Sequence, residues 1–231
     1  MDRVRAAFRH ECARLERILG ALTDADLDLP TPCPPWLVRD LVAHVSTGAG
    51  RLAGMFAAPA PPRAEVDAAG YFGPAKFAPE VDAARVTAAQ AEAARLAAPR
   101  VHEAARLAAA RAAFGDAWRA TDAAVGAYPV GRLVRTRHGE AMTAADFLVT
   151  RVVEVGVHGL DLAAAVGRQP WLTPAAAAVI GDLITGGAPA PDALGWDPLT
   201  LVLKTTGRAP LDQAERAVVA TAGFRRLSFA G

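Results

Sequence analysis

The sequence predicts an all-α protein in which four main helices form a bundle, followed by a smaller, mostly helical appendage. Alanine and leucine dominate the hydrophobic residues, which make up 52% of the chain, and both lose little side-chain entropy in a helix. Apolar residues recur at helical spacing between breaks rich in proline and glycine, and no stretch alternates as strands do. We therefore divide the 231 residues into a helical bundle (1–170) and a small C-terminal region (171–231).

The expected helices of the first 130 residues are, in order, 3–22, 36–56, 79–98 and 101–126. The first two are separated by residues 23–35, where four prolines prevent a regular element. Residues 57–79 are rich in proline, glycine and alanine, and we expect a surface loop that carries Tyr71, Phe72 and Phe77.

Capping signals define the helices of the second half. Thr143, followed by Asp146, resembles a capping box, and the helix that it opens should run to Val166, because Gly167 supplies a stop. The remaining expected elements are an irregular or briefly extended segment (132–142), a helix from Thr173-Pro174 to Gly186-Gly187, a segment that is either strand or helix (198–208), and a helix from Asp212 to Ala222.

Charge and cysteine content exclude several classes of protein. Basic and acidic residues are nearly balanced, 25 against 24, and no basic stripe indicates a nucleic-acid partner. Cys12 and Cys33 form neither a disulfide framework nor a zinc-finger spacing. The first residues, MDRVRAAFRHEC, contain no apolar core and no cleavage site, so we expect no secretion signal. No apolar run reaches a membrane-spanning length. We expect a soluble, cytoplasmic protein without a membrane partner.

The expected helix over 143–166 combines an apolar surface with an ionisable stripe. A helix that is apolar nearly all round should be buried, yet Arg151, Glu154, His158 and Asp161 lie on it at offsets 0, 3, 7 and 10, which places them on one face. Ionisable groups in a core are costly unless they pair or coordinate a metal. One interpretation is a ladder of structural ion pairs, Arg151 with Glu154 and His158 with Asp161.

The other interpretation is a metal site. Glu154 and His158, at positions i and i+4, can reach one ion, and His44, on the apolar stripe of the second helix, is the candidate third ligand. Asp40 could accept the second ring N–H of His44, and Asp161 could do the same for His158, as outer partners of metal-bound histidines do. Two histidines and one glutamate leave a coordination position open, which is typical of a catalytic site.

Two further residues are weaker candidates. His138 lies close in sequence to the site helix and could line a pocket. Cys33 lies in a proline-flanked turn, and nothing nearby in sequence would lower the pKa of its thiol. We expect a packing role for Cys33.

Two sequence blocks, PTPCPPWLVRDLVAHV (30–45) and DFLVTRVVEVGVHGLDLAAAVG (146–167), resemble the mycothiol-dependent maleylpyruvate isomerase family of the DinB-like superfamily. The resemblance covers about residues 1–170. It implies a DinB-like four-helix bundle, zinc held by His44, Glu154 and His158, and mycothiol as the thiol cosubstrate. The segment TTGR (205–208) is similar to a late Gly-Arg element of such chains, so Arg208 is a candidate to face the site. The C-terminal region departs from the small α/β domain of the isomerases.

These observations lead to one main functional hypothesis and two alternatives. The main hypothesis is an enzyme that uses zinc, or another divalent metal, to activate mycothiol toward a small electrophile, as a cis-trans isomerase or a thiol S-transferase. Arg151 is a candidate to hold an anionic group of the substrate or to pair with Glu154. The alternatives are a thiol-independent metalloenzyme of the hydrolase or non-haem iron type, and a non-catalytic helical protein that binds a small molecule. We expect a monomer or a homodimer with no nucleic-acid partner.

Overall fold

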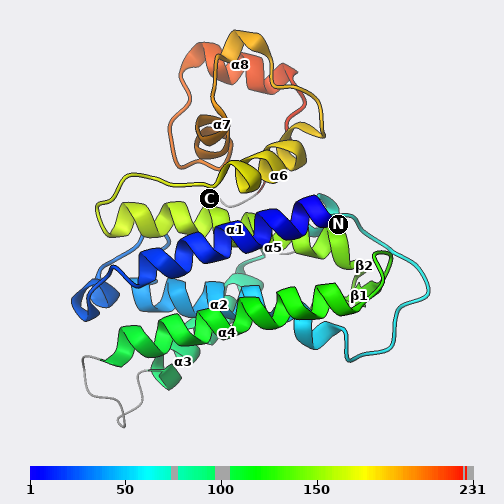
Figure 1. The fold of residues 1–231 in the computed structure, drawn as a ribbon. Helices are drawn as coiled ribbons and strands as arrows, with labels where there is room; N and C mark the ends of the chain where they lie inside the picture. The colour runs from blue at the N-terminus through cyan, green and yellow to red at the C-terminus, as the bar shows by residue number, and fades with distance from the viewer. Residues whose placement is uncertain (74–77, 97–104, 226, 228–231) are drawn as a thin grey trace.

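Four long helices form the bundle that the sequence predicts. The computed structural model describes residues 1–231 except 74–77, 97–104, 226 and 228–231. The bundle consists of α1 (Asp2–Leu19), α2 (Val38–Met55), α4 (Arg106–Ala127) and α5 (Ala144–Ala165). Each of these helices packs against two others, because α1 and α2 both contact α4 and α5 (Figure 1). The all-α class is confirmed.

The connection between α2 and α4 covers one side of the bundle. It contains the short 3-10 helix η2 (Gly70–Phe72) and helix α3 (Pro79–Leu96), which packs mainly on α2. The expectation of a surface loop is wrong for Tyr71 and Phe72, because both are buried. The Tyr71 ring meets the Phe147 ring of α5 edge-on at 5.8 Å, so the aromatic side chains anchor this loop to the bundle. Phe77 lies outside the described residues.

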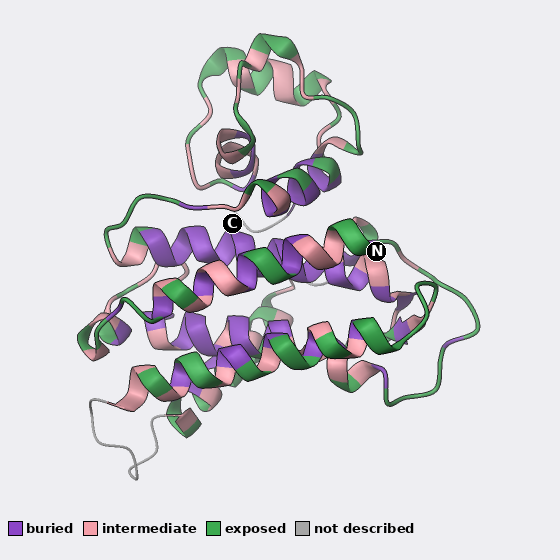
Figure 2. Ribbon diagram, in the orientation of Figure 1, coloured by how far each residue is buried: buried purple, intermediate pink, exposed green. Residues whose placement is uncertain are grey.

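A small hairpin leads into α5. Strand β1 (Leu133–Arg135) pairs antiparallel with β2 (Ala141–Thr143), with Leu133 opposite Thr143. Thr143 Oγ1 then accepts a hydrogen bond from the backbone N–H of Asp146 at 2.9 Å, which confirms the predicted N-terminus of α5. Every residue from Thr150 to Ala163 is buried (Figure 2). The prediction that this helix lies in the core is confirmed.

The C-terminal region is helical and lies against α1 and α5 (Figure 1). Its helices are α6 (Pro174–Thr185), α7 (Pro198–Thr205) and α8 (Gln213–Thr221). Besides η2, the described residues form the short 3-10 helices η1 (Asp24–Asp28), before α2, and η5 (Asp192–Leu194), between α6 and α7. The ambiguous segment 198–208 is mostly α7, because the Asp197 carboxylate caps its N-terminus by accepting from Thr200 N at 2.8 Å. None of the described helices has the length and apolarity needed to span a membrane.

One buried carboxylate joins α1 to this C-terminal region and gives a prediction about pH. Glu11 is fully buried, and its Oε2 accepts hydrogen bonds from Thr173 N and Oγ1 at 2.8 and 2.6 Å. Burial raises the pKa of Glu11 above its ordinary value of 4.5, although the bonds from Thr173 oppose this. A folded-state pKa above the unfolded one means that the stability contributed by Glu11 is present at low pH and is lost as pH rises through the folded pKa.

We therefore expect the free energy of unfolding of the native protein, relative to that of Glu11→Gln, to fall as pH rises from about 4.5 toward neutrality. Urea unfolding at a series of pH values measures this difference. Glu80→Gln is the matched control, because Glu80 is exposed on α3. Parallel stability curves for the native protein and Glu11→Gln would contradict the prediction.

Candidate metal centre and its pocket

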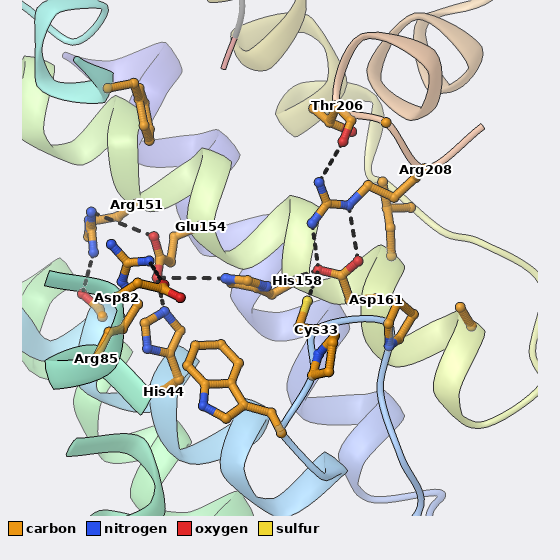
Figure 3. Close-up of a pocket in the computed structure, with 18 of the residues that line it drawn as sticks. Cys33, His44, Asp82, Arg85, Arg151, Glu154, His158, Asp161, Thr206 and Arg208 are labelled. Atoms are coloured by element: carbon orange, nitrogen blue, oxygen red, sulfur yellow. Dashed lines mark hydrogen bonds and ion pairs between the residues drawn. The ribbon is translucent and has the colours of Figure 1, made fainter. Parts of the chain in front are cut away.

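Helices α2 and α5 bring the three predicted ligands together. His44 Nε2 lies 2.6 Å from Glu154 Oε1, and His158 Nε2 lies 4.0 Å from the same oxygen (Figure 3). One donor atom from each residue lies within 4.8 Å of the other two. Gly48 permits this approach of the helices, since a Cβ at that position would stand 3.2 Å from Arg151 Nη1 and 3.3 Å from Glu154 Cγ.

The donor set suits a divalent cation. Imidazole nitrogens and a carboxylate oxygen are the ligands of catalytic zinc, which keeps a further position for water or substrate. The side chains of His44, Glu154 and His158 are 12%, 12% and 9% exposed and line one pocket. A cluster that is largely desolvated and still open to a pocket can hold an ion that a small molecule reaches. The residues therefore fit the predicted metal, and their assignment as ligands stays a prediction.

The charges around Glu154 keep its carboxyl group ionised, which is the form that binds a cation. Burial acts to raise the pKa of Glu154, but the positive charge of Arg151 and the hydrogen bond from His44 lower it well below its ordinary value. Arg151 Nη2 lies 3.8 Å from Glu154 Oε2. Burial lowers the pKa of His44, despite the attraction of Glu154. At neutral pH the pair is thus a carboxylate that accepts from a neutral imidazole.

Asp161 lies behind His158, as the helical spacing predicted. Its Oδ2 is 3.0 Å from His158 Nδ1, and its side chain is 1% exposed. Arg208 donates to both oxygens of Asp161, from Nε at 3.0 Å and from Nη2 at 2.8 Å. Burial acts to lower the pKa of His158, but Asp161 and Cys33 raise it to about 10. With Nδ1 engaged by Asp161, the His158 ring presents Nε2 to Glu154.

Asp40 does not take the position predicted for it. Its carboxylate accepts a hydrogen bond from Leu37 N at 3.0 Å, in the first turn of α2; within the described part of the chain, no hydrogen bond joins it to His44. A carboxylate three residues after the N-cap, Leu37, is attracted by the unpaired N–H groups of the first turn, and that attraction prevails. Trp36, which the sequence analysis did not single out, packs on the His44 imidazole instead, with ring centroids 4.6 Å apart.

Cys33 also has a partner that the sequence did not indicate. Its Sγ lies 3.3 Å from Asp161 Oδ2, so the half-buried thiol borders the site and is more than a packing residue. Cys33, Asp161 and His158 form a second group of possible metal donors within 4.8 Å of one another. The neighbours of Cys33 come from α5, 128 residues further along the chain, and local sequence could not reveal them.

A large cavity, of about 1160 Å³, opens over the triad. His138, a weaker candidate from the sequence, lines it, and so does Arg208, which follows α7. Arg151 lines it too but is engaged: its guanidinium lies 4.7 Å from the Phe147 ring centroid and donates to Tyr71 Oη at 3.4 Å. The other polar residues of the lining include Arg51, Asp82, Arg85, Arg137 and Arg168.

Substitution of Asp161 tests its support of His158. Asp161→Asn keeps the size of the side chain but removes the charge that faces His158 and Arg208. We expect the affinity for zinc to fall by about 10- to 100-fold, as it does when outer partners of metal-bound histidines are lost. Competition with a chromophoric chelator measures this affinity, and Asp182→Asn, at an exposed position of α6, is the control. Equal zinc affinities in Asp161→Asn and Asp182→Asn would contradict the role of Asp161 as the support of a metal-bound His158.

Comparison with known proteins gives one family match and two similar structures. The family model of the mycothiol maleylpyruvate isomerase N-terminal domain matches residues 8–163. A crystal structure of the mycothiol-dependent maleylpyruvate isomerase shares 17% identity, with a TM-score of 0.46, over 70% of this chain and 59% of that chain. A histidine-to-alanine mutant of a mycothiol-dependent maleylpyruvate isomerase also shares 17% identity, with a TM-score of 0.51, over 80% and 68%. No curated protein matches the chain.

Proposed function

Because the chain belongs to the mycothiol maleylpyruvate isomerase N-terminal domain family, we propose that it is a zinc-dependent enzyme that activates mycothiol as a nucleophile toward a small electrophile. The observation that supports this proposal is the convergence of His44, Glu154 and His158 in the lining of one cavity. Mycothiol is an intracellular thiol, so the proposal also implies a cytoplasmic enzyme.

Each residue of the site has a separate part in this proposal. A bound divalent cation would deprotonate a coordinated thiol, which at a free pKa of about 8.5 is mostly protonated at neutral pH. Arg151 keeps Glu154 ionised, and Trp36 and Asp161 hold the rings of His44 and His158. These contacts fix the orientation of the donor atoms before any ligand binds, which lowers the entropic cost of forming the site.

The activated thiol can lead to two products. In an isomerase, the sulfur adds to a conjugated cis double bond, the resulting single bond rotates, and elimination of the thiol leaves the trans product. In an S-transferase, the sulfur stays on the substrate. The second outcome remains a candidate because the family match ends at residue 163, whereas Arg208 of the cavity lies beyond it. We propose residues 1–170 as the metal-binding unit and 171–231 as a separate region that completes the cavity.

Cobalt-substituted protein provides the decisive test. Metal analysis should find one cobalt ion per chain, and titration with mycothiol should produce an ultraviolet charge-transfer band from the cobalt–thiolate bond. Bound metal without this band would favour a thiol-independent metalloenzyme, and the absence of stoichiometric metal would favour a non-catalytic binding protein. Incubation with maleylpyruvate and mycothiol then separates the two reactions, since an isomerase releases a trans isomer of unchanged mass and a transferase releases a thioether.

A further inference from the structure

The cavity carries more positive than negative side chains. Among the described residues, its lining contains six arginines, Arg51, Arg85, Arg137, Arg151, Arg168 and Arg208, and three carboxylates, Asp82, Glu154 and Asp161. Each carboxylate is already engaged: Asp82 by Arg85 at 2.7 Å, Glu154 by His44 and Arg151, and Asp161 by Arg208 and His158. Arg168 donates to the backbone oxygen of Ala21 at 2.7 Å. Of the six, Arg51 and Arg137 have no carboxylate or carbonyl partner among the described residues.

Arg51 extends the ligand face of α2 beyond the triad. It lies seven residues after His44, two helical turns along the same face, and its side chain is half-buried against the cavity. Within the described residues it forms no hydrogen bond and no ion pair. Burial and the neighbouring charges of Arg137 and Arg151 lower the pKa of Arg51, and the more weakly acting Glu154 only partly opposes them. A partly desolvated cation beside two others is unfavourable unless an anion offsets the charge.

Arg137 approaches the same part of the cavity from the turn between β1 and β2. Its Nε lies 3.1 Å from His138 Nε2, and the His138 ring lies 6.5 Å from the Tyr71 ring, so the turn borders the wall that holds Arg151. Arg137 has no carboxylate partner in the described parts of the chain. A cation from α2 and a cation from the hairpin turn thus both line the cavity, close enough for their charges to interact.

We propose that Arg51 and Arg137 form an oxyanion subsite that binds a carboxylate group of the electrophilic substrate. Guanidinium groups bind carboxylates through two parallel N–H···O bonds, which fix orientation as well as charge. Arg51 lies close enough to Glu154 for their charges to interact, and both line the same cavity, so the subsite would hold an anionic electrophile near a thiol bound at the triad. Arg151, whose cation already pairs with Glu154 and packs on Phe147, is a structural partner of this subsite. The identity of the bound group as substrate rests on the proposed function.

Calorimetric titration of the full-length protein with succinate, at constant ionic strength and without thiol, tests the subsite. We expect Arg51→Gln to reduce the affinity for succinate by roughly 10- to 100-fold, the range for loss of a charge-assisted hydrogen bond, and Arg137→Gln to reduce it less, because Arg137 is exposed. Arg51→Lys, which keeps the charge but loses the planar fork, should fall in between. Arg63→Gln is the matched control, since Arg63 is exposed outside the cavity. Neutral succinamide should not distinguish the variants.

Equal succinate affinities in Arg51→Gln and Arg63→Gln, both folded by circular dichroism, would overturn the proposal. So would inorganic phosphate that binds more tightly than succinate and loses its binding in Arg51→Gln, because the site would then select free phosphate. The cobalt–thiolate band separates this test from the proposed function. A band that persists in Arg51→Gln while succinate binding is lost supports both proposals. Succinate binding that depends on Arg51 in a protein without the band supports the subsite and rejects the thiol.

Discussion

Replacement of His44 by alanine is expected to abolish mycothiol binding and to weaken zinc binding by more than the roughly 10- to 100-fold that loss of an outer partner costs. His44 supplies the donor from α2, and its Nε2 lies 2.6 Å from Glu154 Oε1; without it, both remaining donors come from α5. The bundle should stay folded, because burial lowers the pKa of His44 and alanine therefore removes an uncharged ring. Chelator competition and the cobalt–thiolate titration measure the two losses.

Two further variants make this result specific. Glu154→Gln should show the same pattern, since an amide oxygen is a much weaker ligand for zinc than a carboxylate. His10→Ala, at an exposed position of α1, should bind metal and thiol like the native protein. If folded His44→Ala and Glu154→Gln both kept native thiol affinity, the proposed site would be rejected.

Replacement of Arg151 by methionine is expected to lower the free energy of unfolding by about 3–5 kcal/mol, the usual cost of removing one partner of a buried ion pair. Arg151 is 3% exposed, and its guanidinium lies 3.8 Å from the Glu154 carboxylate and 4.7 Å from the centroid of the Phe147 ring. Methionine fills much of the volume but leaves Glu154 without its largest stabilising charge. Urea denaturation of metal-free protein measures the loss.

The double variant Arg151→Met/Glu154→Gln identifies the cause. If the cost arises from an uncompensated carboxylate, neutralising position 154 should restore most of the lost stability, as a coupling energy in a double-mutant cycle. A single-variant loss below about 1 kcal/mol, the scale of an exposed pair, would show that water reaches Glu154 freely and that the ion pair is not buried in solution.

The parts of the fold and site that could be predicted are those that depend on residues close together in the sequence. The apolar surface of α5 predicted its burial, Thr143 predicted its start, and the spacing of Glu154 and His158 predicted that their donor atoms share one side of the helix. His44 could be found because a polar residue on an apolar stripe needs a partner.

The missed features depend on contacts between distant segments. Tyr71 is buried against Phe147 of α5, and the Phe72 ring packs edge-on against Tyr71; composition alone cannot show these contacts. Cys33 gains its polar neighbour from α5. Arg51 is half-buried and lies near the charges of Arg137, from the hairpin turn, and Arg151, from α5. For Asp40 the prediction was wrong for a local reason. Its spacing allowed it either to cap the start of α2 or to accept from His44, and its carboxylate accepts from the nearer backbone N–H of Leu37.

Arg208 links the C-terminal region to the candidate metal site. It donates hydrogen bonds to both oxygens of Asp161, and Asp161 in turn contacts His158 Nδ1. A displacement of the segment after α7 would therefore shift His158, one of the three predicted metal ligands. A chain that ended at residue 163, where the family match stops, would keep all three donors and lose this brace. A change in the sequence after the family-matched region could thus alter the placement of His158 while His44, Glu154 and His158 themselves stay the same.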